Sequence, residues 1–238
     1  MRTSSVQPRS DRRCLSTEEI DALRRFSSPT IANALEALGL PATAARHTNA
    51  GMRCLFPQLG AMVGYACTAT ILSHRPAAEP RKIWRTHYWK YTRAAAAPRL
   101  TVVQDLSEEP GGAYWGEVNA NIHRVLGSLG VITNGTVRDI EEVRPLGFHF
   151  FASGVQVSHG YAHLEDFDRP VKVFGMLVYP GDLIHADRHG AVVIPQELAA
   201  AVSEAAREVE RKEKPMIALC QSPDFSIEEL DKLIPHAY

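Results

Sequence analysis

The spacing of apolar residues along the chain predicts helices that alternate with strands. Apolar positions recur at helical intervals over 16–26, 28–39, 84–95, 118–129 and 196–214. Runs rich in β-branched and small residues predict strands over 60–72, 100–106, 131–133, 148–157, 171–178 and 182–194. Strands interleaved with helices are typical of an α/β fold. Because the sequence shows neither an internal repeat nor a low-complexity linker, we expect a single domain over residues 16–238, ending in a charged helical segment.

Capping residues set the expected ends of the first two helices. Ser16 and Glu19 fit a capping box, in which each side chain accepts a hydrogen bond from an otherwise unpaired backbone N–H. Ser28 can cap the second helix, with Pro29 at its first position and Gly39 at its end.

The helix predicted over 118–129 carries apolar residues at positions i, i+4, i+7, i+8 and i+11. This spacing predicts one buried face, and Gly130 should end the helix. The residues of that face are Val118, Ile122, Val125, Leu126 and Leu129.

Composition and charge exclude several classes of protein. The chain has 238 residues, of which 45% are hydrophobic and 22% charged, which suits one sizeable core and not a disordered chain. Lys plus Arg number 26 and Asp plus Glu 27, so the net charge is −1. Because nucleic-acid and membrane-surface binding usually need a basic excess, we expect neither partner. No apolar run reaches the ~18 residues of a membrane-spanning helix.

The N-terminal residues and the cysteines suit a cytoplasmic protein. Residues 1–15 are rich in arginine and lack the apolar stretch of a secretory signal, so we expect a flexible tail. The cysteines are scattered and form no Cys-x-x-Cys pair, which argues against a disulfide scaffold and a zinc finger. They are Cys14, Cys54, Cys67 and Cys220.

The segment over 81–95 is unusual in composition, because aromatic residues at helical spacing alternate with cations. One interpretation is a helix whose aromatic stripe packs on the body while its cations stay in water. Another is a lid over an anionic substrate, and stacking on nucleic acid is a weaker third because one short stripe is a weak signal. The aromatic positions are Trp84, Tyr88 and Tyr91, and the cations are Arg81, Lys82, Arg85, Lys90 and Arg93.

Candidate chemistry gathers around the start of the helix over 118–129. A glycine-rich loop ends at Gly116, and the first N–H groups of the helix, near Val118 and Asn119, can bind a carboxylate or phosphate. The following strand ends shortly before residue 138. In open α/β sheets the carboxyl ends of strands and the adjacent helix N-termini share one crevice, so both segments should border one pocket.

Arg138 and Asp139 bring opposite charges to this pocket. An arginine can hold a carboxylate through two parallel hydrogen bonds. Asp139 can ligate a hard cation such as Mg²⁺, which needs only one or two protein carboxylates, and Glu117 adds a second carboxylate nearby. On spacing alone, a surface ion pair between neighbouring residues stays the commoner explanation.

Two groups of histidines deserve comparison with metal sites. His159 and His163 have the i, i+4 spacing that lets a helix share a metal between two ligands, but the surrounding sequence predicts strand and loop. In a strand, His185, Asp187 and His189 would point to one face, which we expect to be solvated.

Two stretches of the sequence resemble the RraA-like family. The first combines GE at 116–117 with GTVRDIEE at 135–142, and the second is PGDLIHADRHGAVVIP at 180–195. The segment SPTIANALEALG at 28–39 also resembles the family's N-terminal helix, and the similarity runs over roughly 16–215. The family includes class II 4-hydroxy-4-methyl-2-oxoglutarate aldolases, which also decarboxylate oxaloacetate.

This resemblance implies an α/β domain of the swivelling β/β/α type, assembled as a homotrimer or a dimer of trimers with active sites between subunits. The family's arginine falls on Arg138 and its metal-binding aspartate on Asp139. Glu117 and Glu142 match acidic positions of the family, and Glu213 matches a glutamate that a neighbouring subunit gives to the metal's water shell. The expected cofactor is Mg²⁺ or Mn²⁺.

The implied activity is that of a divalent-metal-dependent C–C lyase acting on a small 2-oxo acid. It would release pyruvate from a 4-hydroxy-2-oxo acid, decarboxylate oxaloacetate, or both. The metal and Arg138 would stabilise charge on the enolate oxygen, while Gly116, Val118 and Asn119 bind substrate. Glu117 is the candidate base for the hydroxyl proton in the retro-aldol step.

Two alternatives stay open. Some relatives bind and regulate ribonuclease E without a metal; they tend to lack the aspartate after the arginine, so Asp139 favours the enzyme. The other is a relative recruited to a different enolate reaction in a specialised pathway. The enlarged segment over 75–99 leaves room for it, as do Asn33, Asn134 and His189, which replace the family's usual aspartates.

Overall fold

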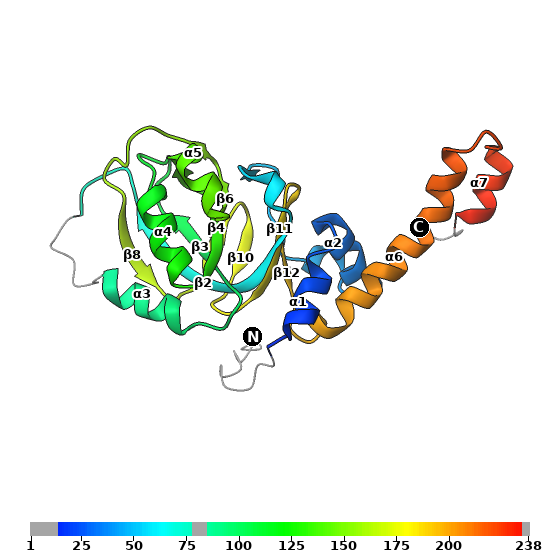
Figure 1. Cartoon of the computed structure of the whole chain (residues 1–238), viewed down its shortest axis with the longest axis horizontal. Helices are drawn as coiled ribbons and strands as arrows, with labels where there is room; N and C mark the ends of the chain where they lie inside the picture. The colour runs from blue at the N-terminus through cyan, green and yellow to red at the C-terminus, as the bar shows by residue number, and fades with distance from the viewer. Residues whose placement is uncertain (1–13, 78–84, 235–238) are drawn as a thin grey trace.

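The computed structural model describes residues 14–77 and 85–234, and its longest strand, β2 (Met62–Leu72), organises the rest (Figure 1). β2 pairs with β3 on one side. On its other side, β11 lies opposite its first half and β8 opposite its second half. Most of the predicted tail, the positions Arg81, Lys82 and Trp84, and the last four residues of the predicted domain lie outside the described residues.

Eight of the described strands form one mixed sheet, in the order β1-β6-β4-β3-β2-β11-β12 with β8 paired to β2. The central strands β2, β3, β4 and β6 run parallel, and the outer pairings are antiparallel. The sheet curls into a nearly closed barrel, which confirms the predicted α/β domain (Figure 1). The strands of this sheet besides β2 are β1 (Arg53–Cys54), β3 (Arg99–Asp105), β4 (Ser128–Thr133), β6 (His149–Ala152), β8 (His163–Phe167), β11 (Leu183–Asp187) and β12 (Gly190–Ile194).

The helices lie in two groups (Figure 1). On one side are α3 (Arg85–Ala94), α4 (Glu117–Val125) and α5 (Ile140–Val143). On the other, α1 (Thr17–Leu23), α2 (Ser28–Ala37) and the first part of α6 (Ala199–Cys220) pack together beside β11 and β12. The rest of α6 projects from the body, and α7 (Ile227–Leu233) folds back against it. None of the helices in the described ranges combines the length and the apolar composition needed to cross a bilayer.

Short elements complete the chain. Two small ladders pair β5 (Thr136–Val137) with β7 (Gly154–Val155), and β9 (Val171–Val173) with β10 (Met176–Val178). Single 3-10 turns occur at Ala42–Ala44, Pro57–Leu59 and Arg144–Leu146.

The capping prediction is confirmed for α1 and shifted by one residue for α2. Ser16 and Glu19 form both hydrogen bonds of a capping box. In α2 the cap is Ser27, whose hydroxyl accepts a hydrogen bond from the N–H of Thr30 at 3.2 Å. Ser28, the predicted cap, is the first helical residue. Its side chain turns instead toward β11, where its hydroxyl lies 2.9 Å from Nδ1 of His185.

The predicted buried face of α4 is wrong. The helix ends near Leu126, because Gly127 takes a left-handed φ of 88° and the chain then enters β4. Val118 and Val125 are 71% and 68% exposed, whereas Ala120 and His123 are buried. Since His123 packs against Trp115 and Tyr88, α4 turns a small residue and an aromatic ring toward the body. Of the predicted face, Val118 and Val125 therefore point outward, whereas Ile122, Leu126 and Leu129 are half-buried.

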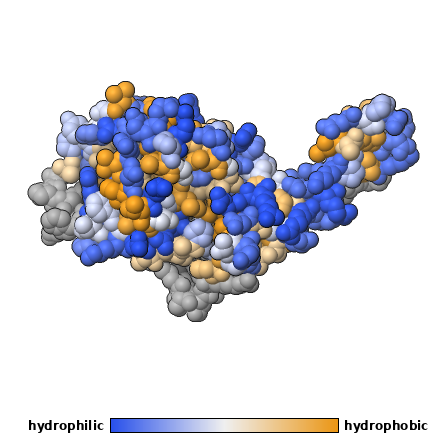
Figure 2. Space-filling view, viewed as in Figure 1, coloured by the Kyte–Doolittle hydropathy of each residue, from blue (hydrophilic) through white to orange (hydrophobic). Residues whose placement is uncertain are grey.

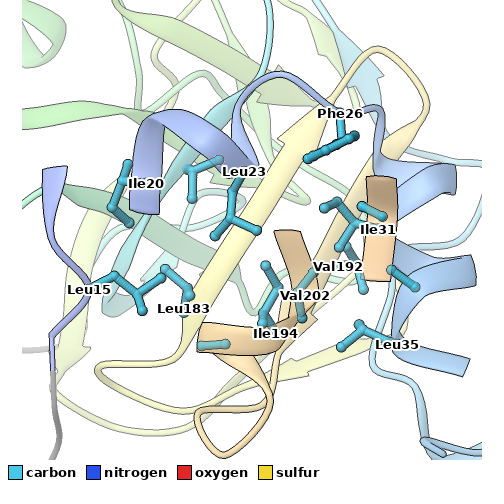
Figure 3. Close-up of a cluster of buried hydrophobic side chains, with 14 of the residues drawn as sticks. Leu15, Ile20, Leu23, Phe26, Ile31, Leu35, Leu183, Val192, Ile194 and Val202 are labelled. Atoms are coloured by element: carbon cyan, nitrogen blue, oxygen red, sulfur yellow. The ribbon is translucent and has the colours of Figure 1, made fainter. Parts of the chain in front are cut away.

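Two of the buried clusters bear on the site. The first joins α1, α2 and α6 to β11 and β12 (Figure 3). The second lies under α3 and α4 and contains Tyr88, Trp115, Phe148 and Phe150. Tyr88 is fully buried in it, whereas the described cations of the same helix, Arg85, Lys90 and Arg93, are exposed. For the described part of the basic aromatic segment, the packing interpretation is thus confirmed.

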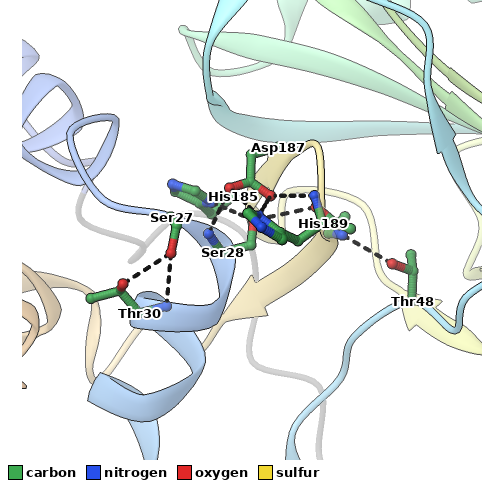
Figure 4. Close-up of polar contacts among 9 residues, drawn as sticks. Ser27, Ser28, Thr30, Thr48, His185, Asp187 and His189 are labelled. Atoms are coloured by element: carbon green, nitrogen blue, oxygen red, sulfur yellow. Dashed lines mark hydrogen bonds and ion pairs between the residues drawn. The ribbon is translucent and has the colours of Figure 1, made fainter. Parts of the chain in front are cut away.

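The expectation that His185 and Asp187 face solvent is also wrong. Both are buried, because the first turn of α2 covers this face of β11 (Figure 4). The Asp187 carboxylate accepts hydrogen bonds from the N–H groups of Ser28 and His189, at 2.9 and 2.8 Å. Asp187 thereby satisfies a first-turn donor of α2, which makes this cluster a structural tie between helix and strand.

We expect the free energy of unfolding to fall as the pH is lowered from 6.5 toward 4. Burial lowers the pKa of His123, His149 and His185 from 6.5 to about 4. In this range the unfolded chain binds protons that the folded chain rejects, so stability present above pH 6.5 is lost. Each histidine should contribute a loss of about 1–2 kcal/mol between pH 7 and pH 5.

Urea unfolding at the two pH values measures this loss. His123→Phe should reduce the pH dependence, whereas His87→Gln, at an exposed position of α3, should leave it unchanged. Equal stability of the native sequence at pH 7 and pH 5 would contradict the expectation.

Candidate active site

The loops that follow β3 and β4 meet at the carboxyl edge of the parallel strands and enclose a pocket of about 240 Å³. This edge is where α/β sheets generally bind ligands. The structure places five predicted residues together at the pocket: Gly116, Val118, Asn119, Arg138 and Asp139. Arg85, Ala113, Tyr114, His159 and Ala162 complete its lining.

A hydrogen bond from the N–H of Glu117 to Oδ2 of Asp139, 2.9 Å long, joins the two halves of the pocket. Gly116 is the N-cap of α4 and has no side chain to offer, so Asp139 takes over this capping role from a distant loop. The same Oδ2 lies 3.6 Å from Nε of Arg138. One carboxylate thus fixes the start of α4 and holds the arginine beside it.

The backbone around Asp139 is unusual. Asp139 has φ 57° and ψ 48°, the left-handed conformation, which non-glycine residues adopt rarely. Gly116 allows this approach, since a Cβ there would collide with Oδ2 of Asp139 and lie 3.0 Å from Cγ of Arg138. The glycine before α4 is therefore required by the side chains of the next loop.

The core holds the backbone of Arg138 in place. The N–H of Arg138 donates to the carbonyl of Trp115 at 2.9 Å, and the preceding Val137 forms a bridge with Trp115. Trp115 is itself fully buried and stacks with Phe148. Because this contact lies directly before Gly116, the two loops that form the pocket are fastened to one another at their base.

His159 and Arg85 line the pocket although neither belongs to the stretch 116–142. His159 sits on a loop that packs so closely on Gly112 that a Cβ at Gly112 would overlap the backbone of His159. Arg85 begins α3. The sequence analysis singled out His159 as one of a histidine pair and Arg85 as a cation of the segment 81–95. Their common place at the pocket depends on long-range packing, which the sequence pattern does not indicate.

The three glutamates of the predicted site are not among the residues that line the pocket. Glu117 is exposed at the first position of α4, and Glu142 is exposed on α5. Glu213 belongs to the second half of α6, and this half of the helix projects from the body (Figure 1). Among the described residues, no three His, Cys, Asp or Glu side chains converge as a metal cluster.

The side chains at the pocket suit Mg²⁺ or Mn²⁺ better than Zn²⁺. A zinc site of the predicted histidines would need several converging ligands, and His163 is instead 2.9 Å from Glu165. Mg²⁺ and Mn²⁺ accept one or two protein carboxylates and fill the remaining positions with water and substrate oxygens. Asp139, at the pocket and 33% exposed in its side chain, fits that requirement.

Gly116→Ala should weaken the joint between the two loops. We expect a loss of about 1–3 kcal/mol in the free energy of unfolding, because Asp139 must move to admit the methyl group. Hydrogen exchange at the N–H of Glu117 should accelerate, since that group loses its acceptor. Gly154→Ala is the matched control, because a Cβ there meets nothing within 4 Å. Unchanged exchange at Glu117 would show that the bond survives the added methyl group.

Comparison with known proteins identifies the family of the chain. A family model described as RraA-like (Aldolase/RraA) matches residues 28–193. The chain is 33% identical over 103 residues to an uncharacterized protein of Methanocaldococcus jannaschii, covering 43% of this chain and 50% of that protein. It is 38% identical over 72 residues to the 4-hydroxy-4-methyl-2-oxoglutarate aldolase of Thermus thermophilus, covering 29% and 43%. The chain thus spans half or less of the length of these relatives.

Solved structures share the fold over most of the chain. Streptomyces coelicolor RraAS2, described as an unusual member of the RNase ES inhibitor RraA protein family, has a TM-score of 0.67 and 25% identity, covering 85% of this chain and 96% of that one. An uncharacterized protein from Pseudomonas syringae pv. tomato has a TM-score of 0.74 and 22% identity, covering 97% and 100%. Because the family model matches more than half of the chain and the fold is shared with RraAS2, the chain belongs to the RraA-like family.

Proposed function

We propose that this protein is a cytoplasmic, divalent-metal-dependent C–C lyase. Its substrates would be 4-hydroxy-2-oxo acids cleaved to release pyruvate, oxaloacetate that loses carbon dioxide, or both. The observation that carries the proposal is the placement of Arg138 and Asp139 in one pocket with the first turn of α4. The aldolase name of the Thermus thermophilus relative supports the same class of reaction.

Arg138 binds the carboxylate end of the substrate in this proposal. Its side chain is 37% exposed at the pocket, and a guanidinium matches a carboxylate with two parallel hydrogen bonds. Val118 and Asn119 line the pocket at the positive end of α4, where backbone N–H groups favour an anion. A 2-oxo acid is thereby oriented with its keto oxygen toward Asp139.

Asp139 would hold Mg²⁺ or Mn²⁺, and the bound ion would act as a Lewis acid toward the keto oxygen of the substrate. Arg138 stabilises the enolate charge that grows as the C–C bond breaks, and this charge is larger in the transition state than in the substrate. Glu117 is the proposed base for the hydroxyl proton of a 4-hydroxy acid. It is the first residue of α4, the helix that borders the pocket. Oxaloacetate needs no such base to lose its carboxylate.

The proposed enzyme acts as a homotrimer or a dimer of trimers. Exposed apolar side chains gather over α4, where Val118 and Val125 face solvent (Figure 2). Others lie on the projecting arm formed by α6 and α7, namely Ile217, Phe225 and Ile227, which are 52%, 46% and 73% exposed. Surfaces of this kind usually contact another chain. In such an assembly, Glu213 of a neighbouring copy, together with Glu142, would supply carboxylate oxygens to the cation or to its water.

A binding protein that regulates a ribonuclease is the second candidate. The likeness to RraAS2, described as an unusual member of an RNase ES inhibitor family, favours it. Asp139 and its place in the pocket favour the enzyme, because a regulator that acts by surface contact needs no cation beside an arginine. A different enolate reaction would use the same residues and would appear as turnover of another oxo acid.

Asp139→Asn should lower turnover by about 100-fold or more and remove its response to metal. Asparagine keeps an oxygen that can accept the N–H of Glu117, so the variant retains the fold while losing the charge. Pyruvate release from a panel of hydroxy-oxo acids and oxaloacetate, with and without EDTA, measures the effect. Glu141→Gln is the control, since Glu141 is exposed and pairs with Arg144. Full, EDTA-insensitive activity of Asp139→Asn would refute the metal assignment.

The same assay separates the two candidate functions. Release of no pyruvate from any acid, together with capture of a ribonuclease by the wild-type protein, would favour the regulator. Metal-dependent turnover without ribonuclease binding would favour the lyase.

Ile227→Asp should dissociate the proposed assembly, because it places a charge on an exposed apolar surface of the arm. Light scattering after size-exclusion chromatography should show a shift from trimer or hexamer toward monomer. Asp231→Asn, one turn along the same helix, should have no effect. A monomeric wild-type protein would end the assembly proposal.

A further inference from the structure

Arg85 lines the pocket of Arg138 and Asp139 but has no role in the chemistry proposed above. It lies in α3, outside the stretch 116–142. The described lining of the pocket therefore contains two guanidinium groups, one from α3 and one from the loop before α5, and one carboxylate.

Arg85 is exposed, and its surroundings differ from those of Arg138. Within the described ranges no carboxylate forms an ion pair with Arg85, whereas Arg138 has Asp139 at 3.6 Å. The charge of Arg85 is thus the one at this pocket without a protein counter-charge among the described residues.

The charge of Arg85 acts on the pocket wall. Burial raises the pKa of the Tyr114 hydroxyl, and the positive charge of Arg85 partly offsets that rise. Tyr114 and Arg85 both line the pocket. His159 lies in the same lining and uses Nδ1 to donate a hydrogen bond to the carbonyl of Gly160 at 2.8 Å, which leaves Nε2 as its nitrogen for a ligand.

We propose that Arg85 binds a second carboxylate of the substrate, away from the 2-oxo acid end that Arg138 binds. Arg85 is then a specificity-determining residue that selects dicarboxylic over monocarboxylic oxo acids. The inference rests on the proposed function for the orientation of the substrate. Its physical basis is separate: a guanidinium without a protein counter-charge among the described residues attracts an anionic group more strongly than a neutral one, and it can hold a carboxylate through two parallel hydrogen bonds.

Binding of two unreactive acids tests this role. 2-Oxoglutarate and 2-oxopentanoate share the same carbon chain and 2-oxo acid group, and they differ in the second carboxylate. In calorimetric titrations with Mg²⁺ present, the wild-type protein should bind 2-oxoglutarate about tenfold more tightly or better. Arg85→Met should bring this ratio close to one and leave the affinity for 2-oxopentanoate unchanged.

Lys90→Met is the matched control, because Lys90 is exposed on the same helix and does not line the pocket. It removes an equal charge and should preserve the ratio. A wild-type ratio near one, binding of neither acid, or an equal loss of both affinities in Arg85→Met would overturn the role of Arg85. So would an effect of Lys90→Met as large as that of Arg85→Met.

Failure of the lyase proposal gives a different result. A preserved preference for 2-oxoglutarate that depends on Arg85, together with no pyruvate release from any acid, would refute the catalysis and support the binding role. Pyruvate release that is equally efficient from monocarboxylic and dicarboxylic acids would refute the role of Arg85 and keep the catalysis.

Discussion

The hydrogen bond between Asp139 and the first N–H of α4 is the constraint on which the pocket depends. It joins the loop after β4 to the helix that follows β3, and these segments are separated by 22 residues along the chain. The bond needs a left-handed residue at Asp139 and a residue without a Cβ at Gly116. Local strain of this kind is kept where the surrounding structure enforces it, and here the enforcement comes from the buried Trp115 below.

This arrangement gives Asp139 two roles that compete for the same carboxylate. One oxygen accepts the N–H of Glu117 and approaches Arg138, so it is directed by the protein before any ligand binds. A cation in the proposed function would bind to a carboxylate already oriented by its neighbours. Such orientation reduces the entropy that a ligand must lose on binding, and it makes the capping bond part of the proposed site.

Local signals in the sequence predicted local structure well. The capping box at Ser16 and the strands over 182–194 depend on residues close in sequence, and both are present. The covering of His185 depends on Ser28, 157 residues away, and no local pattern indicates it. The prediction of the buried face of α4 failed for a related reason. Periodicity shows that Val118 and Val125 share one side of the helix, but it does not show whether this chain or another chain covers that side. The gathering of Arg85 and His159 at the pocket likewise comes from tertiary packing.

The basic aromatic helix shows why the two interpretations of its sequence are compatible. Its middle is fixed by Tyr88, which is fully buried between His123 and Phe167, so the helix is part of the core. Arg85 of the same helix lies at the pocket, one turn before that anchor. A guanidinium on a well-packed helix has fewer accessible conformations than one on a mobile lid, so it loses less conformational entropy when a ligand binds. For that reason a core helix with its end at the pocket is a better support for recognition of an anionic group than a mobile cover would be.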